Sequence, residues 1–270
     1  MSAAPPPAVL LDLAVYTARE AAALITRERG SAAAAVDVKS SPTDVVTAVD
    51  TAAEQLITSR LLAARPDDGL LGEEGADRQG TSGVRWVVDP IDGTVNFLYG
   101  LRGYAVSIAA QVDGATVAGA VLDVPTGELF TATAGGGAFL STPAEPEPVR
   151  LSGNRPDSLG QTLVATGFGY RVEQRRAQGA VVAALLTEVR DIRRQGCASL
   201  DLCSVAAGRV DAYYELDLKP WDHAAGALVA AEAGLVVTGL PGRPFAAPMA
   251  VAVPETVAEP FLALLDRLHP

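Results

Sequence analysis

The segment VRWVVDPIDGTVNF, residues 84–97, constrains the fold of this chain more than any other. Its apolar first part, residues 84–88, predicts a buried strand. Asp89 is therefore expected where that strand ends, because Pro90 has no N–H group with which to continue the ladder of hydrogen bonds. A helix could then begin near Gly93, so the segment predicts a junction between a strand and a helix.

The same junction carries groups suited to binding ions. The carboxylates of Asp89 and Asp92, with the carbonyl of Ile91 between them, can converge on a divalent cation such as Mg²⁺. Backbone N–H groups of Gly93 and Thr94, at the start of a helix, attract an anion. Asp, Pro and Gly are also ordinary turn formers, and the motif by itself is equally compatible with a plain turn.

Composition narrows the class of protein. The chain has 270 residues, 49% of them hydrophobic, enough for a large core in one compact unit or two tight subdomains. A formal net charge of −11 argues against binding to nucleic acid or to anionic membranes. No apolar run reaches membrane-spanning length, and no secretory signal is visible. Cys197 and Cys203 would lie on different parts of a helix surface, so free thiols and a cytoplasmic location are expected.

The pattern of elements predicts a mixed α and β fold. Helices are expected over residues 8–29 and 46–64, and a short strand over 69–74. Strands then follow one another over residues 104–140, with hairpin signals at Asp113-Gly114 and Thr126-Gly127. An antiparallel sheet is therefore expected in the middle of the chain.

A loop rich in Pro and Glu, residues 141–148, is the best candidate for a domain boundary. Beyond it strands and helices alternate over residues 163–166, 173–190, 197–208, 210–215 and 223–233. We therefore expect an N-terminal α+β subdomain, residues 1–150, that carries most of the metal ligands. A C-terminal α/β subdomain, residues 151–270, would complete the substrate site.

Two acidic residues could share the cation of the first motif. Glu73, where a strand gives way to a loop, could reach the same ion as Asp89, because neighbouring strand ends gather at one edge of a sheet. A solvated pair of glutamates is the alternative at this position. Asp222 precedes an Ala-rich helix as an expected N-cap, and it could serve as a metal ligand there as well.

Two further acidic residues could face the substrate. Asp50 fits a capping box with Thr47, and it could also accept a hydrogen bond from a catalytic hydroxyl or water. Glu215 lies seven residues before Asp222 at the end of an apolar run. Both could face one pocket and accept hydrogen bonds from a polyol, although Glu215 could equally be a surface residue.

Together and in this order, these sites resemble the inositol monophosphatase family, which belongs to the metal-dependent, lithium-sensitive sugar phosphatases. The resemblance spreads through most of the chain, and two longer stretches are similar to the actinobacterial inositol-1-monophosphatases. It implies a layered α-β-α-β-α sandwich of the inositol monophosphatase and fructose-1,6-bisphosphatase type, usually a homodimer. The matching blocks are KSSPTDVVTAVD (39–50), LLGEEG (70–75), WVVDPIDGTVNF (86–97), GRVDAYYE (208–215) and WDHAAGALVAAEAG (221–234).

The resemblance implies roles for the acidic residues. Glu73, Asp89 and the carbonyl of Ile91 match the ligands of a first Mg²⁺ ion. Asp89, Asp92 and Asp222 match those of a second, so Asp89 would bridge the two. A third and weaker Mg²⁺ would depend on Glu73 and on water, which gives two to three ions for each active site.

The resemblance also implies the rest of the active site. Asp50 and Thr94 match the pair that orients and activates the attacking water, and the N–H groups of Gly93 and Thr94 would bind the substrate phosphate. Cys197 stands where relatives usually carry Ser or Thr, and we expect it to be buried as a small apolar side chain. The positions that match contacts to the inositol hydroxyls are Gly196, Ala198, Glu215 and Asp222.

The implied function is the Mg²⁺-dependent hydrolysis of a small phosphorylated polyol, with inositol 1-phosphate as the first candidate. Fructose-1,6-bisphosphate, histidinol phosphate and 3′-phosphoadenosine nucleotides are alternatives within the same chemistry. The segment 196–201 has no basic residue, which favours a monophosphate. A regulatory binding protein is the alternative from another class, since some bacterial relatives bind RNA polymerase or ribosome-associated partners.

Overall fold

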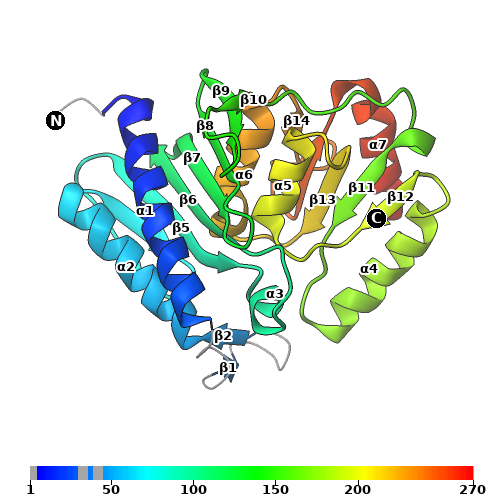
Figure 1. Ribbon diagram of the computed structural model, residues 1–270. Coiled ribbons are helices and arrows are strands. Elements are labelled where there is room, and N and C mark those ends of the chain that lie inside the picture. The colour runs from blue at the N-terminus through cyan, green and yellow to red at the C-terminus, as the bar shows by residue number, and fades with distance from the viewer. Residues whose placement is uncertain (1–4, 30–35, 39–44, 270) are drawn as a thin grey trace.

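The computed structural model describes residues 5–29, 36–38 and 45–269 (Figure 1). Helices and sheets alternate in five layers, and the predicted α-β-α-β-α sandwich is confirmed. Within the described residues, a small antiparallel pair of strands, β1 (Val36–Val38) and β2 (Val45–Thr47), stands apart from the two main sheets. Among all the described residues, no helix has the length and apolar character needed to cross a membrane.

The larger sheet has eight strands in the described residues. Most neighbours are antiparallel, as the hairpin signals predicted, but β3 and β5 run parallel. Asp113 and Gly114 both have positive φ, 50° and 82°, as a tight two-residue hairpin requires. In order across the sheet the strands are β10 (Val149–Arg150), β9 (Gly137–Ser141), β8 (Leu129–Thr133), β7 (Ala115–Asp123), β6 (Ala105–Val112), β5 (Val84–Asp92), β3 (Gly69–Gly72) and β4 (Asp77–Arg78).

The smaller sheet is built from the C-terminal half of the chain. Its order is β12 (Asp191–Arg193), β11 (Leu163–Thr166), β13 (Ala212–Leu216), β15 (Met249–Val253) and β14 (Val236–Thr238). The chain passes from one sheet to the other after β10, through residues 151–162, which include the short helix η2 (Leu159–Gln161). The division into two subdomains at residue 150 stays a prediction.

The helices fill the three remaining layers (Figure 1). α1 (Pro7–Glu28) and α2 (Ala48–Ala64) cover the outer face of the larger sheet. α5 (Ala198–Ala206) and α6 (Pro220–Glu232) lie between the two sheets, and α4 (Val172–Leu185) and α7 (Glu255–Leu268) cover the outer face of the smaller one. Three buried clusters, made mainly of Ala, Val and Leu, fill the space beneath the outer helices of each sheet and between the two sheets. The central cluster joins the two halves of the chain.

Two sequence-based expectations about element boundaries are wrong. β5 does not end at Val88 but continues to Asp92, because it resumes pairing with β6 at Ala105 after a local irregularity. Asp222 is not the N-cap of α6, because Pro220 begins the helix and Lys219 caps it. Pro is favoured at the first position of a helix, where its missing N–H costs nothing. Asp222 is therefore the third residue of the helix.

A buried carboxylate anchors the turn between α2 and β3. The side chain of Asp68 is 1% exposed and accepts hydrogen bonds from three side chains. The Trp86 indole donates at 2.9 Å and the Ser82 hydroxyl at 2.6 Å. Arg65 completes the set with two N–H donors, at 2.5 and 3.0 Å. This turn fixes the start of β3, which carries Glu73 into the pocket described below.

Replacing Asp68 with Ala leaves these three donors without an acceptor. We expect the free energy of unfolding to fall by about 3–5 kcal/mol, as when one partner of a buried ion pair is removed. Urea unfolding of the two proteins measures the loss. Asp191→Asn, which breaks the exposed pair with Arg193, is the control and should cost less than about 1 kcal/mol. Equal effects of the two substitutions would contradict the assignment of Asp68 as an anchor.

Candidate metal-binding active site

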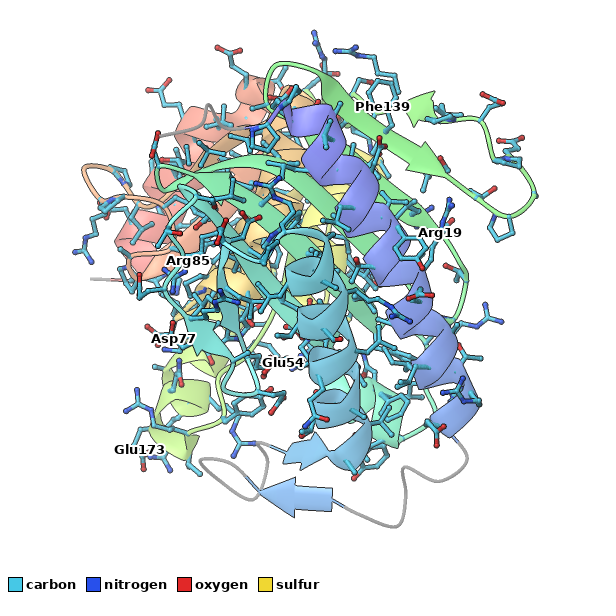
Figure 2. All side chains as sticks on the ribbon, turned by 90° about the vertical axis from the view of Figure 1, so that its left-hand side faces the viewer. Arg19, Glu54, Asp77, Arg85, Phe139 and Glu173 are labelled. Atoms are coloured by element: carbon cyan, nitrogen blue, oxygen red, sulfur yellow. The ribbon has the colours of Figure 1, made fainter. Side chains whose placement is uncertain are left out.

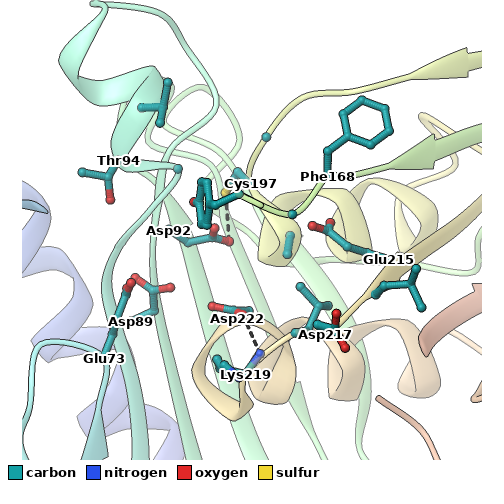
Figure 3. Close-up of a pocket in the computed structure, with 18 of the residues that line it drawn as sticks. Glu73, Asp89, Asp92, Thr94, Phe168, Cys197, Glu215, Asp217, Lys219 and Asp222 are labelled. Atoms are coloured by element: carbon teal, nitrogen blue, oxygen red, sulfur yellow. Dashed lines mark hydrogen bonds between the residues drawn. The ribbon is translucent and has the colours of Figure 1, made fainter. Parts of the chain in front are cut away.

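A pocket of about 1220 Å³ opens where β5 and the end of β3 meet α3 (Thr94–Leu98), α5 and β13 (Figure 3). Nearly all the candidate site residues line it, although they come from distant parts of the chain. Their roles stay predictions, but the structure brings them to one place. The lining includes Glu73, Asp89, Ile91, Asp92, Gly93, Thr94, Gly196, Ala198, Glu215 and Asp222.

The irregularity in β5 explains how two aspartates of one strand reach the same pocket. Residues three apart in a regular strand point to opposite faces of the sheet. Between Asp89 and Asp92 the register with β6 shifts, where Pro90 offers no N–H group to the ladder. The bulge therefore turns both carboxylates toward the pocket.

Glu73 reaches the same place from the neighbouring strand. β3 runs parallel to β5, with Gly72 paired to Val88, and the N–H of Glu73 donates to the carbonyl of Val88 at 3.2 Å. Because the carboxyl ends of parallel strands meet at one edge, Glu73 lies beside Asp89 (Figure 3). The convergence of Glu73 and Asp89 follows from this pairing.

Burial and mutual repulsion act on these acids. Burial raises the pKa of Asp89 well above its usual range, and the negative charges of Glu73, Asp92 and Asp222 raise it further. The pKa of Asp222 is also raised well above its usual range, by burial and then by the charge of Asp92. The Asp89 side chain is 1% exposed, and its Oδ1 atom has no hydrogen-bond partner. A buried carboxylate of this kind is unfavourable unless it takes up a proton or gains a counter-charge.

The donor set fits a hard divalent cation. It consists of oxygen atoms alone, from four carboxylates and the carbonyl of Ile91, and such ligands suit Mg²⁺. The Oδ1 atom of Asp89, which has no hydrogen-bond partner, is available to bind such a cation. As they stand, no three acidic, His or Cys side chains of the described residues are close enough together to hold an ion. The acids form an open cluster that a cation would draw together.

The start of α5 holds one oxygen of Asp92. Its Oδ2 atom accepts hydrogen bonds from the N–H of Ser199 at 2.7 Å and from the thiol of Cys197 at 3.1 Å (Figure 3). Cys197 is buried, as expected, with 1% of it exposed, but it is not only an apolar filler. Its S–H group donates to a candidate ligand.

Asp50 and Thr94 are paired in the structure. The Thr94 hydroxyl lies 3.1 Å from both Asp50 Oδ1 and the carbonyl of Ile91, and it can donate to either. Asp50 also closes the predicted capping box with Thr47, whose N–H donates to Asp50 Oδ2 at 2.9 Å. Burial raises the pKa of Asp50. Of the block 39–50, residues 39–44 lie outside the described part of the chain.

Gly93 lets the chain turn sharply from β5 into α3. Its φ of 93° lies in the left-handed region, which other residues rarely adopt. A Cβ atom there would also lie 2.8 Å from the carbonyl oxygen of Gly103. The backbone can therefore bring the first N–H groups of α3 to the pocket wall only with glycine at this position.

The opposite wall carries the candidate polyol contacts. Glu215, at the end of β13, accepts a hydrogen bond from the Tyr213 hydroxyl at 2.7 Å, and burial raises the pKa of Glu215 to about 7. Asp222 Oδ2 accepts from the N–H of Lys219 at 2.6 Å. Gly196 and Ala198 flank the N-cap of α5. In Figure 3, Asp222 lies between Glu215 on one side and Glu73 and Asp89 on the other.

Four basic residues of this pocket were given no role in the sequence analysis. The segment 196–201 indeed has no basic residue, but Arg171, Arg175, Arg194 and Lys219 reach the pocket from other segments. The guanidinium of Arg194 lies over the Phe168 ring, with its central carbon 5.9 Å from the ring centroid. Arg171 and Arg175 are one turn apart at the start of α4, the spacing that could have signalled a shared face.

The chain is similar to known proteins over most of its length. A model of the inositol monophosphatase family matches residues 7–265. The inositol-1-monophosphatase of Mycobacterium bovis is 48% identical over 278 residues, covering 97% of this chain and 95% of that protein. The structure of Mycobacterium tuberculosis SuhB superposes with a TM-score of 0.84 at 43% identity, over 98% of each chain. The Nus factor SuhB of Escherichia coli is 40% identical over 235 residues, 86% of each chain.

The hydrogen bond from Cys197 to Asp92 can be tested by two substitutions. Cys197→Ser keeps a donor at this position, whereas Cys197→Ala removes it. We expect the Ala variant to lose about 1 kcal/mol of stabilisation at Asp92, or about fivefold in phosphate release from an ester, and the Ser variant to stay within about twofold. Steady-state assays with both proteins measure this. An Ala variant as active as the wild type would show that the thiol only fills space.

Proposed function

The chain belongs to the inositol monophosphatase family, a family of phosphatases, and on that premise we propose that it is a Mg²⁺-dependent phosphomonoester hydrolase. The proposed substrate is myo-inositol 1-phosphate, which would be hydrolysed to myo-inositol and phosphate. The observation that carries the proposal is the gathering of Glu73, Asp89, Asp92 and Asp222 in one pocket beside the paired Asp50 and Thr94. The name of the Mycobacterium bovis relative supports the choice of substrate.

The acidic wall, which consists of Glu73, Asp89, Asp92 and Asp222, would hold the metal ions. Glu73, Asp89 and the Ile91 carbonyl would bind a first Mg²⁺, and Asp89, Asp92 and Asp222 a second. A third ion would depend on Glu73 and on water. Bound there, the ions supply positive charge that neutralises the phosphate oxygens and acidifies water.

Asp50 and Thr94 would handle the proton of the attacking water. Because the Thr94 hydroxyl can donate to Asp50 Oδ1, its oxygen is free to accept a hydrogen bond from a water in the pocket. Asp50 is buried and its pKa is raised, so its carboxylate is the better base for taking up that proton. The N–H groups of Gly93 and Thr94 would bind the phosphate oxygens and stabilise their charge.

The opposite wall would orient the alcohol. Glu215 is fixed by the Tyr213 hydroxyl, so its remaining oxygen can accept from a polyol hydroxyl. Asp222 would accept from a second hydroxyl, beside Gly196 and Ala198 at the start of α5. Holding the ester in this way directs its phosphate toward the acidic wall, which is the positioning that lowers the barrier.

We further propose that the protein acts as a homodimer in the cytoplasm. The resemblance implies the dimer. Both cysteines are free and buried, which suits a reducing compartment. Size-exclusion chromatography with light scattering measures the oligomeric state, and a monomer under all conditions would contradict the dimer.

The central assay is phosphate release from myo-inositol 1-phosphate with and without Mg²⁺. We expect turnover that requires Mg²⁺, and we expect Asp89→Asn to lower it by about a thousandfold or more, since two ions lose one ligand and several kcal/mol of stabilisation. Asp191→Asn is the matched control, because it removes the charge of an exposed aspartate outside the pocket. Full activity in Asp89→Asn, or none in the wild type, would contradict the proposed function.

A second substrate class is favoured by the basic residues of the pocket. Arg171, Arg175, Arg194 and Lys219 line the same pocket as the acidic residues, and the pocket exceeds the ~300–1,000 Å³ typical of small-molecule sites. An ester that carries a second phosphate, such as fructose-1,6-bisphosphate, could pair this phosphate with the arginines. The expectation of a monophosphate from the segment 196–201 alone therefore loses its support.

The two substrate classes are separated by one double variant. Arg171→Gln/Arg175→Gln should lower kcat/KM for fructose-1,6-bisphosphate by about tenfold or more, about 1.4 kcal/mol, while leaving myo-inositol 1-phosphate within about twofold. Arg176→Gln is the control, since Arg176 is exposed beside Arg175 but does not line the pocket. An unchanged ratio between the two esters would rule out a second-phosphate site at this rim.

A regulatory role can coexist with catalysis. The Escherichia coli relative is named a Nus factor, so binding to partners of the transcription machinery is the candidate from another class. The complete set of acidic residues in the pocket supports catalysis, because a protein that only binds partners has no need of them. A pull-down from native lysate with the wild type and Asp89→Asn distinguishes the roles, since only catalysis depends on Asp89.

A further inference from the structure

The loop that carries Glu73 is tied to helix α2 by a second buried acid. Glu54 lies one turn after Asp50 on α2, and its side chain is 5% exposed (Figure 2). Its Oε2 atom accepts a hydrogen bond from the N–H of Glu74 at 2.8 Å. Its Oε1 atom accepts from the N–H of Ala76 at 3.0 Å. Both oxygens of this carboxylate are therefore used to hold the backbone of the loop.

The end of β3 is shaped to receive this carboxylate. A Cβ atom on Gly72 would lie 2.2 Å from Glu54 Oε2, so only glycine lets the two approach. The N–H of Gly72 donates to the carbonyl of Ala76 at 2.6 Å and closes the loop on itself. Glu73 is thus fixed from two sides, by β5 through its own N–H and by α2 through Glu54.

Glu54 is unsuited to a metal-ligand role itself, because its two oxygens already accept backbone N–H groups. A neutral side chain would add no charge next to the acidic wall. Only a carboxylate, however, offers two oxygen acceptors at this reach, one for each N–H group. Its charge also strengthens both hydrogen bonds. The cost of a further buried acid is offset by a loop held in one position.

We propose that Glu54 is a positioning residue for the metal site, setting the place of Glu73 through the backbone of residues 72–76. The inference rests on the proposed function, because it assigns Glu54 a part in binding the same ions. On α2, Asp50 reaches Thr94 and Glu54 holds the Glu73 loop, so one helix sets the positions of the two sides of the reaction site. Groups that orient the ligands of a metal typically account for about 10–100-fold in its affinity.

The test is direct Mg²⁺ binding by isothermal titration calorimetry with the full chain. Glu54→Gln replaces one acceptor oxygen with an NH₂ donor that faces a backbone N–H. We expect it to weaken Mg²⁺ binding by about 10–100-fold. At saturating Mg²⁺, kcat should remain within about twofold, since Glu54 touches no reacting atom. A residue that only stabilised the fold would not separate the Mg²⁺ requirement from kcat in this way.

Two further variants secure the result. Glu54→Asp keeps the charge but is one methylene shorter, so its carboxylate cannot reach both N–H groups. This variant should also weaken Mg²⁺ binding. It serves as the test if Glu54→Gln does not fold. Arg60 lies on the same helix as Glu54 and forms an exposed pair with Glu20 of α1. The variant Arg60→Gln breaks this pair and should bind Mg²⁺ as the wild type does. If both Glu54 variants bound Mg²⁺ with wild-type affinity, the inference about Glu54 would be overturned and the proposed function would stand. A wild type that binds no Mg²⁺ would overturn the proposed function, and the inference with it.

Discussion

Repulsion among buried carboxylates is the interaction on which the rest of this site depends. Asp89, Asp92 and Asp222 come from two elements, and β3 adds Glu73, in a region where burial already disfavours negative charge. Backbone pairing, a bulge and a helix start hold these acids where they are. A fold that holds like charges close together in this way is stabilised when a cation binds among them. The proposed metal ions would account for the acidic wall.

The two walls of the pocket have opposite character. The acidic wall comes from the edge of the larger sheet and the basic rim from the start of α4 and neighbouring loops. With metal ions on the acidic wall, both sides attract an anion, although the chain has a formal net charge of −11. The placement of charge, more than its total, decides which substrates the pocket admits.

Local patterns in the sequence predicted much of this fold. The Asp113-Gly114 hairpin and the Thr47 cap of α2 depend on residues close in the chain, and both were found where expected. The end of β5 was misplaced because Asp92 pairs with Ala105, a contact that the segment itself does not reveal. The roles of Glu54 and Arg194 depend on contacts with distant backbone or rings, and no spacing alone could have assigned them.

The most direct test of the account is to locate the ions themselves. Crystals of the protein grown with Mn²⁺ as a substitute for Mg²⁺ would show metal positions in an anomalous difference map. The account predicts at least two peaks on the acidic wall, as in other two-metal sites, with Asp89 between them and Glu73 and Asp222 on either side. A map with no peak among these residues, or with ions bound only elsewhere on the molecule, would contradict it.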